Sequence, residues 1–496
     1  MEPISLSRIL AHWRALQPDR PAVTHEGESL TWTEFDDHTN RLARAYAERG
    51  VIQDDFVTIA LPNGIEFLAA TFATWKLGAT PQPVSARLPP LELRRLLEVG
   101  QPRLVVGVDA GDHPEANTVP SGFEPEPSLS AEPLAERTAT SFKAMTSGGS
   151  TGRPKLIVSK VPAAWDPDAE FLEFGQRGAV LIPGPLYHNG PFSWAVIALF
   201  KGNHVVVTTR FDAEQTLALI EKQRIDTVYL VPTMMHRIWN LPTAVRTRHD
   251  LSSLRVVWHL AAPCPAWLKE NWIAWLGPNV IWELYGGTEG QGATTIRGDD
   301  WLAHKGSVGR PTEACEMKIV DEQGAELPRG AIGEVYMRPK AGAGTTYRYI
   351  GDTPRAIAGG WESIGDMGYM DADGYLYLTD RLSDMILRGG ANIYPAEVEA
   401  AIDAFPGVRS SAVIGLPHAE LGNELHAIVD APDGDCDEAT LRAHLAEHLV
   451  RYKVPATFEF TTEPLRDDAG KVRRKALREA RLAPPTGDTQ ARPPVS

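Results

Sequence analysis

Cysteine is scarce in this sequence. Only Cys264, Cys315 and Cys436 occur in 496 residues, far apart and odd in number. This pattern argues against a disulfide framework and fits a reducing compartment, so we expect a cytoplasmic protein. No cluster of cysteine and histidine has the spacing of a zinc finger.

Long hydrophobic runs are absent as well. No apolar stretch is long enough to cross a bilayer, so no membrane span is expected. The N-terminal segment, MEPISLSRILAHWRALQPDR, lacks the unbroken apolar core of a signal peptide. The C-terminal residues, ARPPVS, resemble neither a lipid-anchor motif nor a peroxisomal address.

Long basic runs are also missing, and the formal net charge is −15. Non-specific binding to nucleic acid is therefore not expected. Any site for an anionic ligand must gather N–H donors and basic groups locally. A chain of 496 residues with 43% hydrophobic and 23% charged residues is a globular protein too long for one small core, so two or more domains are expected.

The first two-thirds of the chain alternates helical and strand-like patterns. Apolar residues at helical spacing predict a helix over 6–16, Thr31 and Glu34 form a capping-box pattern that begins a second helix, and a third is expected over 65–77. Short apolar runs predict buried strands over 56–61 and near residues 105, 180, 205, 229, 256 and 280. This alternation predicts an α/β fold of mostly parallel sheets covered by helices.

The pattern changes after residue 307. Short strands with glycine-rich turns are expected to residue 378, which predicts a small β-rich part. A smaller α+β unit follows, with helices over 395–404 and 438–449 and a strand near 412. We therefore expect a large N-terminal domain, residues 1–381, and a small C-terminal domain, residues 382–496.

The segment from Thr146 to Lys155, TSGGSTGRPK, is typical of a phosphate-binding loop. Its glycines let the backbone approach an anion and turn N–H groups inward, its hydroxyls add donors, and Lys155 adds charge. It is not a Walker A loop, because the Gly-Lys-Ser/Thr ending is absent. A flexible Ser/Gly surface turn would have the same composition. The strand-like SFKAM before the loop and LIV after it favour a fixed loop.

Further motifs follow this loop in a fixed order. They are Tyr285-Gly286-Gly287-Thr288-Glu289, Gly365-Asp366 with Asp380-Arg381, GGANIYPAEVE from Gly389, and the segment from Pro464 through Gly470-Lys471 to Leu477; Leu61-Pro62-Asn63 and Lys76-Leu77-Gly78-Ala79 are weaker early matches. Together they resemble the ANL superfamily of adenylate-forming enzymes over nearly the whole chain, in the branch of acyl-CoA synthetases. The resemblance implies ATP, magnesium and coenzyme A as cofactors.

By this resemblance, the nucleotide is bound by residues from four motifs. They are Thr146, Ser147, Gly148, Gly149, Ser150, Thr151 and Lys155 in the loop, Ala261, Ala262 and Pro263, then Glu283, Tyr285 and Gly286, and finally Asp366 and Arg381. Asp366 has a short acceptor suited to two ribose hydroxyls, although a turn aspartate is the usual outcome of Gly-Asp. Arg381 is expected to donate to ribose or phosphate, or to form a surface salt bridge.

Three residues are expected to be catalytic. Thr288 holds the α-phosphate and acyl carboxylate region by resemblance. Glu289 is assigned to magnesium, which prefers a carboxylate together with phosphate oxygens and water, rather than being a carboxylate at a helix start. Lys471 is expected to neutralise the five-coordinate α-phosphate; the alternative is one member of a solvated basic run. The resemblance implies that Lys471 reaches the site only when a mobile C-terminal domain docks.

After pyrophosphate leaves, the resemblance implies that the C-terminal domain rotates. Gly389 and Gly390 then line the pantetheine channel, where a side chain would obstruct the thiol, although either glycine alone could be a plain turn. The hinge falls at Ser383, where many relatives carry Asp or Lys. This departure leaves the hinge rate open.

The acyl pocket is expected beside Pro185-Leu186-Tyr187-His188-Asn189-Gly190. Its expected lining is Tyr187, His188, Phe192, Trp194, Trp258 and Gly287, although His188 could be structural and most of the aromatic residues could be core. No aspartate in this segment could hold an ammonium group, which argues against an amino-acid substrate. Leu260 and Ala261 replace two family glycines, and the AAPCP wording is similar to that of synthetases for steroid or bile acids, so a bulky apolar acid is hypothesised.

The predicted function is an AMP-forming acid–CoA ligase that acts on ATP, CoA and a carboxylic acid, with a homodimer as one possible assembly. Two alternatives stay open. One is a ligase that loads a carrier protein with the acyl group, and the other is a catalytically silent nucleotide-binding homologue.

Overall fold

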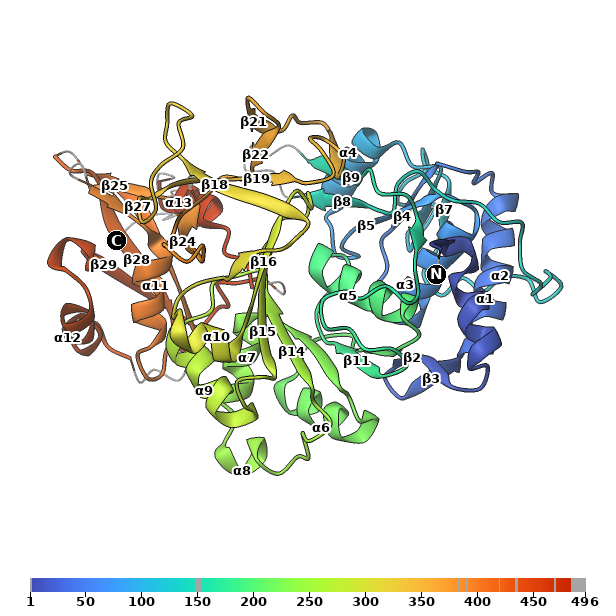
Figure 1. Ribbon diagram of the computed structural model, residues 1–496, viewed down its shortest axis with the longest axis horizontal. Coiled ribbons are helices and arrows are strands. Elements are labelled where there is room, and N and C mark those ends of the chain that lie inside the picture. The colour runs from blue at the N-terminus through green and yellow to red at the C-terminus, as the bar shows by residue number, and fades with distance from the viewer. Residues whose placement is uncertain are drawn as a thin grey trace, which may run out of the picture. The chain divides into compact units, whose positions relative to one another are not determined.

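The computed structural model describes residues 2–147, 154–381, 384–388, 391–418, 420–432, 436–467 and 470–482 (Figure 1). The described residues divide into two compact units. The larger unit contains the residues up to Leu378, and the smaller one begins at Thr379. The boundary between residues 381 and 382 and the mobility of the second domain stay predictions.

A nine-stranded sheet organises the larger unit. Six neighbouring strands, β15 to β2, are parallel, and an antiparallel strand follows at each end. In spatial order the strands are β17 (Arg310–Pro311), β16 (Ala293–Arg297), β15 (Ile281–Gly286), β14 (Val256–Leu260), β13 (Thr227–Leu230), β11 (Ala179–Ile182), β12 (His204–Val207), β2 (Pro21–His25) and β3 (Glu28–Thr31).

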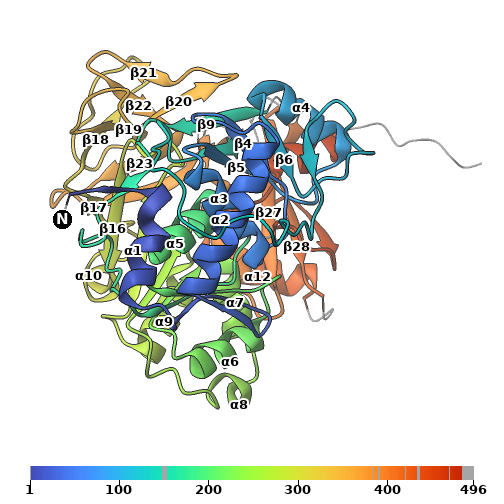
Figure 2. The ribbon, with the colours of Figure 1, turned by 90° about the vertical axis from the view of Figure 1, so that its right-hand side faces the viewer.

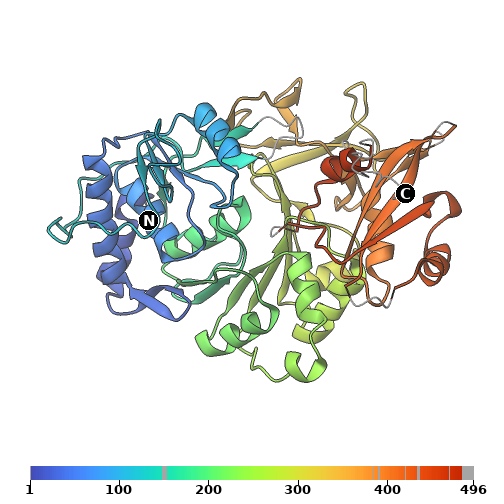
Figure 3. The same ribbon diagram turned by 180° about the vertical axis from the view of Figure 1, so that it is seen from behind.

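Helices pack against these strands, against the smaller sheets or against one another (Figures 1 and 3). They are α1 (Leu6–Leu16), α2 (Trp32–Glu48), α3 (Ile65–Lys76), α4 (Pro90–Gly100), α5 (Asn189–Phe200), α6 (Ala213–Gln223), α7 (Pro232–Trp239), α8 (Thr243–Arg246), α9 (Ala266–Leu276) and α10 (Gly298–Ala303). Helices α1, α2 and α3 pack against one another (Figure 2). The predicted α/β fold is confirmed.

The helix starts follow from local sequence. Leu6, Ile9, Leu10 and Trp13 are all buried on one face of α1, and burying each such side chain contributes about 1.5–3 kcal/mol. The predicted capping box is present at the start of α2: Glu34 donates its backbone N–H to the Thr31 hydroxyl, and the Glu34 carboxylate accepts from the Thr31 N–H. Strand β4 (Phe56–Ile59) ends two residues earlier than the expected strand over 56–61.

Smaller sheets complete the larger unit. A parallel sheet contains β5 (Thr80–Pro83), β4, β6 (Leu104–Val106) and β7 (Thr118–Val119), and an antiparallel one contains β20 (Tyr347–Ile350), β9 (Lys155–Ser159) and β8 (Ala144–Ser147). The expected β-rich part is a six-stranded sheet of β21 (Arg355–Ile357), β22 (Trp361–Ser363), β19 (Gly333–Pro339), β23 (Asp366–Met370), β24 (Leu376–Arg381) and β18 (Cys315–Val320). Strand β1 (Ile4–Ser5) pairs with β10 (Ala164–Trp165).

The smaller unit has its own core. It contains the hairpin β25 (Ile386–Arg388) and β26 (Ala391–Ile393), a sheet of β27 (Ser410–His418), β28 (Gly422–Asp430) and β29 (Thr457–Thr461), and the helices α11 (Pro395–Asp403), α12 (Glu438–His448), the short η1 (Arg451–Lys453) and α13 (Arg474–Leu482). The helices expected over 395–404 and 438–449 each end one residue early.

Candidate active site

The predicted phosphate loop joins two paired strands. Strands β8 and β9 are antiparallel, with Thr146 opposite Leu156 and Ser147 opposite Lys155. The structure therefore places strands on both sides of the loop, as the sequence indicates. Residues 148–153, with the predicted ligands Gly148, Gly149, Ser150 and Thr151, lie outside the described residues, as does the side chain of Ser147.

Lys155 is held at the end of this loop by two groups. Its ammonium group donates to the Asp352 carboxylate at 2.8 Å and lies 4.0 Å from the centre of the Tyr349 ring. The ion pair with Lys155 also lowers the pKa of Asp352. A phosphate contact by Lys155 stays a prediction.

Tyr349 connects Lys155 with the predicted magnesium ligand. The Tyr349 hydroxyl donates to Glu289 Oε1 at 2.6 Å. Burial and this hydrogen bond raise the pKa of Tyr349 strongly, so it stays a neutral donor. The phosphate-loop lysine and the carboxylate of the Tyr-Gly-Gly-Thr-Glu motif thus share one tyrosine.

The backbone around Glu289 forms a turn. Gly290 N–H donates to Gly287 O at 3.2 Å, so the alternative interpretation of Glu289 as a carboxylate at a helix start is wrong. A Cβ at Gly287 would lie 2.8 Å from Glu289 Oε2, so a side chain there would displace the Glu289 carboxylate. Thr288 lies half-buried in the same turn.

Tyr285 and Asp366 bring two other predicted nucleotide motifs together. The Tyr285 hydroxyl donates to Asp366 Oδ2 at 2.7 Å. Asp366 is buried at the start of β23, directly after Gly365, whose φ is +85°. The structure thus places the expected ribose ligand beside the end of β15. The side chain of Arg381 lies outside the described part of the structure.

Glu283 belongs to a buried charge cluster. Lys269 donates to Glu283 Oε2 at 2.5 Å, and His259 Nε2 lies 3.8 Å from the same oxygen. Burial, aided by the Lys269 charge, lowers the pKa of His259 well below its usual value. A nucleotide contact by Glu283 stays a prediction. The structure shows its carboxylate in an ion pair with Lys269.

The turn after β14 is strained at Ala261. Its φ is +75°, in the left-handed region that costs a non-glycine residue roughly 1–2 kcal/mol. The resemblance places a glycine here, which agrees with the backbone conformation. Ala262 and Pro263 follow in the same turn, as expected for this segment.

The predicted acyl-pocket residues are divided between a helix start and the core. His188 is the N-cap residue of α5, and its ring lies 4.3 Å from that of Tyr187. Trp194 contacts Trp258 with ring centres 5.9 Å apart. Phe192 packs against Phe67 and Trp75 in the core, the alternative that the sequence left open.

Asn63 shapes one of these segments, a role that its early motif did not predict. Asn63 Nδ2 donates to Gly184 O and Thr208 O, and Leu186 N–H donates to Asn63 Oδ1. This fixes the loop that leads to His188 and gives the early Leu-Pro-Asn motif a structural reason. Lys143, Lys269 and Tyr349 were also missed; a lysine within the strand-like run SFKAM was the one visible signal.

Lys471 lies in the smaller unit. Its N–H donates to Asp467 Oδ1 at 2.9 Å, and it lines a groove of about 560 Å³ with Pro464, Arg466 and Arg473 among others. Nearby Arg466 and Arg474 form ion pairs with Glu399, so this basic stretch is not simply a solvated run. The predicted hinge Ser383 and channel residues Gly389 and Gly390 fall outside the described ranges.

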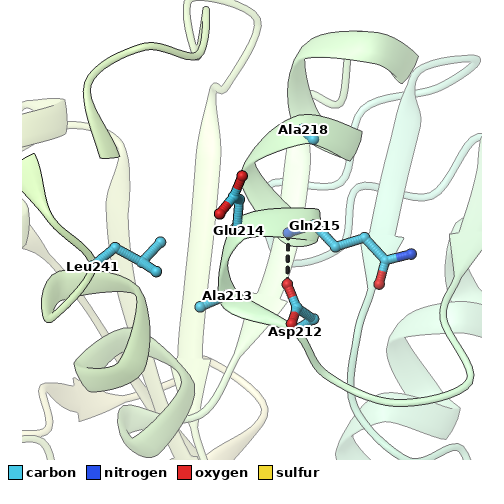
Figure 4. A pocket seen from close by; sticks show the side chains of 6 residues that line it. All are labelled: Asp212, Ala213, Glu214, Gln215, Ala218 and Leu241. Atoms are coloured by element: carbon cyan, nitrogen blue, oxygen red, sulfur yellow. Dashed lines mark hydrogen bonds between the residues drawn. The ribbon is translucent and has the colours of Figure 1, made fainter. Parts of the chain in front are cut away.

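A second pocket, of about 450 Å³, lies at the start of α6 (Figure 4). Its lining is Asp212, Ala213, Glu214, Gln215, Ala218 and Leu241. Asp212 accepts from the Gln215 N–H at 2.8 Å and so caps the helix. None of the predicted site residues lines this pocket, and we assign no function to it.

Two family models match the chain. The first, described as AMP-binding enzyme, matches residues 10–349, and the second, AMP-binding enzyme C-terminal domain, matches residues 397–471. This chain belongs to the AMP-binding enzyme family. The predicted ANL superfamily membership is therefore confirmed, and the AMP-binding enzyme is an adenylate-forming ligase.

Relatives of this AMP-binding enzyme are full-length matches. A feruloyl-CoA synthase of Amycolatopsis sp. is 31% identical, over 93% of this chain and 96% of its own. The long-chain-fatty-acid–CoA ligase FadD13 of Mycobacterium tuberculosis is 28% identical, over 91% and 93%. A fatty acid–[acyl-carrier-protein] ligase, ScoC of Streptomyces coeruleorubidus, is 28% identical, over 93% and 94%. The predicted enzyme class, AMP-forming acid–CoA ligase, agrees with the relatives' names and is confirmed.

Solved structures share the fold. The o-succinylbenzoate CoA synthetase MenE of Bacillus subtilis, in complex with its acyl-adenylate intermediate, has a TM-score of 0.82 at 25% identity and covers 96% of this chain and 99% of its own. ATP-bound MatB of Rhodopseudomonas palustris has a TM-score of 0.81 at 25% identity, over 96% and 98%. In the described residues of the AMP-binding enzyme, no helix is long and apolar enough to span a membrane.

Proposed function

We propose that this enzyme is an ATP-dependent acyl-CoA synthetase. It joins a carboxylic acid to AMP with release of pyrophosphate, and then transfers the acyl group to coenzyme A. The observation that carries the proposal is the group formed by Lys155, Tyr349 and Glu289, since it sets a cation and a carboxylate on one tyrosine beside the loop. The names of the relatives support CoA as the acceptor.

In the first step a carboxylate oxygen attacks the α-phosphorus, and the bond from that phosphorus to the β-phosphate oxygen breaks. Two anions must meet, so catalysis consists mainly of positioning and charge stabilisation. Lys155 and the loop hold phosphate oxygens, while Thr288 orients the reacting carboxylate. Asp366, positioned by Tyr285, accepts from the ribose hydroxyls.

Magnesium fits the side chains that are present. One carboxylate, Glu289, is held by the Tyr349 hydroxyl, and the described residues contain no cluster of three acidic, histidine or cysteine ligands. Magnesium suits such a site because it is bound by one or two carboxylates plus substrate phosphates and water. When bound it neutralises phosphate charge. A MenE structure from Bacillus subtilis holds ATP and magnesium.

Lys471 is proposed to neutralise the α-phosphate oxygens during adenylation. Its placement on a separate compact unit supports a movement of that unit between the two half-reactions. In the second step the thiolate sulfur of CoA attacks the acyl carbon, the bond from that carbon to the phosphate oxygen breaks, and AMP leaves. The thiol proton passes to solvent. Ser383, Gly389 and Gly390 keep their proposed roles as hinge and channel.

We propose a bulky, largely apolar acid as the substrate. Leu260 and Ala261, in place of two glycines, support this, as do the aromatic side chains of Trp194 and Trp258. A cytoplasmic location and a homodimer also remain proposals.

The proposal is tested with a panel of carboxylic acids. Pyrophosphate release should depend on the added acid, and mass spectrometry should detect acyl-AMP without CoA and acyl-CoA with it. Acyl-AMP that accumulates in the presence of CoA, but is consumed by a phosphopantetheinylated carrier protein, would favour the ScoC-like alternative. No acid-dependent pyrophosphate release would favour the catalytically silent homologue.

A further inference from the structure

Lys143 is partly buried, and it differs from the fully buried lysines of the described chain in the groups that it contacts. Lys76 donates to Asp36 at 2.6 Å, and Lys269 donates to Glu283 at 2.5 Å. Lys201 lies within the field of three acidic side chains, Asp166, Asp168 and Glu170. Lys143 instead donates to two neutral oxygens, Asn189 Oδ1 at 2.5 Å and Ser193 Oγ at 2.7 Å.

Among the described residues, no anion pairs with the ammonium group of Lys143. Burial lowers the pKa of Lys143 to about 7, and no charged neighbour contributes to the shift. Its aromatic neighbour Phe142, 5.3 Å from the ammonium group, adds only a weak attraction. A buried charge is normally paired, so an external acceptor at this ammonium group would lower the cost of its burial.

The surroundings of Lys143 also favour negative charge. Asn189 is the first residue of α5 and Ser193 lies one turn further on. The start of a helix carries a partial positive charge, which disfavours a cation and attracts an anion, and no side chain caps α5. The Lys143 ammonium group and the positive end of α5 thus lie together, and no carboxylate among the described residues pairs with them.

The place is the proposed acyl pocket. His188 directly precedes Asn189, and Trp194 directly follows Ser193, so the partners of Lys143 alternate with the expected lining residues along α5. The neighbouring indoles add unused donors: Nε1 of Trp194 and Nε1 of Trp258 are buried and have no acceptor among the described residues. This part of the chain offers donors and few acceptors.

We propose that Lys143 binds a second oxygen acceptor on the acid substrate, remote from the carboxyl group that is activated. The acid is then a bulky apolar skeleton that carries a distal carboxylate, ketone or hydroxyl. This inference rests on the proposed function and narrows its substrate class. The acceptor takes a hydrogen bond from the Lys143 ammonium group and displaces part of its contact with Asn189 and Ser193.

The experiment uses three alicyclic acids with one skeleton, which differ at the far end by a carboxylate, a ketone or a methylene. Acid-dependent pyrophosphate release gives kcat and KM for each. We expect the wild-type enzyme to prefer one or both oxygen-bearing acids. Lys143→Met should lower kcat/KM for the preferred acid by about 10- to 100-fold, mostly through KM, since a hydrogen bond to a charged group is lost. For the methylene acid, Lys143→Met should lower kcat/KM by less than about threefold, because this acid makes no hydrogen bond to Lys143.

Two variants of the neutral partners keep the proposal testable if Lys143→Met folds poorly. Asn189→Asp supplies the missing carboxylate at the same volume, so it should pair with Lys143 and abolish the preference for the oxygen-bearing acid. Ser193→Ala removes one neutral acceptor but leaves the cation, so the preference should persist. Thermal melting checks that both variants fold.

The outcomes separate the inference from the function beneath it. Equal use of the three acids by the wild-type enzyme, or an equal loss for all three in Lys143→Met, overturns the inference while adenylation itself stands. A purely structural role of Lys143 predicts that equal loss. Absence of acid-dependent pyrophosphate release with every acid contradicts the proposed function instead.

Discussion

Tyr349 and Glu289, sixty positions apart in the sequence, are joined by a hydrogen bond of 2.6 Å. The same tyrosine ring lies under the ammonium group of Lys155, at 4.0 Å. A carboxylate that accepts from a neutral tyrosine keeps one oxygen oriented and its charge stabilised. We therefore regard Tyr349 as a positioning residue for the carboxylate that is proposed to bind magnesium.

Tyr349→Phe should raise the magnesium concentration needed for half-maximal adenylation by about tenfold, because loss of a charge-assisted hydrogen bond is worth about 1.5–3 kcal/mol. Pyrophosphate release measured against magnesium concentration gives this value. Tyr377→Phe is the matched control, since the Tyr377 hydroxyl donates to Asp371 rather than to Glu289. Equal shifts in both variants would reject the role of Tyr349.

Asp366→Asn should reduce the selectivity for an intact ribose. The aspartate accepts from Tyr285 at 2.7 Å and is proposed to accept from the ribose hydroxyls as well. The wild-type enzyme should prefer ATP to 2′-deoxy-ATP and 3′-deoxy-ATP, and the variant should show a preference several-fold smaller. The comparison uses kcat/KM from pyrophosphate release. An unchanged ratio would show that Asp366 is only a turn residue.

Lys269→Met should destabilise the larger unit by about 3–5 kcal/mol, because it leaves the Glu283 carboxylate buried without its partner. Urea denaturation at neutral pH measures the free energy of unfolding. The double variant Lys269→Met with Glu283→Gln should recover much of the loss, since no unpaired charge then remains. Additive losses in the double variant would mean that the two residues do not act as a pair.

Ala261→Gly should stabilise the protein by up to about 1 kcal/mol, because φ = +75° is strained for alanine and free for glycine. Ala262→Gly is the control, since Ala262 is not among the residues with positive φ. It should be neutral or slightly destabilising. Thermal melting of both variants decides the matter: a gain in Ala262→Gly alone would contradict the assigned strain.

Local patterns explain how much of the fold the sequence could predict. The apolar spacing of α1 and the capping box of α2 depend on residues within one or two turns, so the bounds of α1 and the start of α2 were predicted. The strands of the large sheet were visible as short apolar runs because parallel strands are buried on both faces. Their spatial order was not visible, since it depends on contacts between distant segments.

The residues of the candidate site also differ in how far the sequence could predict them. Motif residues such as Asp366 and Glu289 were identified because their order along the chain resembles a family. The residues that hold them were missed. Tyr349 and Lys269 reach their partners across distances in sequence that no periodicity records, and neither lies in a motif. Lys143 had one local signal, a charge inside an apolar run, whose meaning required the position of Asn189.

Lys471 is proposed to serve adenylation and not the transfer to CoA. The most direct measurement is the rate of each half-reaction in Lys471→Ala, with Lys475→Ala as the control on the exposed surface of the smaller unit. We predict that Lys471→Ala lowers the rate of acyl-AMP formation by at least about a hundredfold, as expected for loss of a transition-state charge contact, while transfer from supplied acyl-AMP to CoA stays near that of the wild type. Equal losses in the two half-reactions, or none in the first, would rule out this role of Lys471.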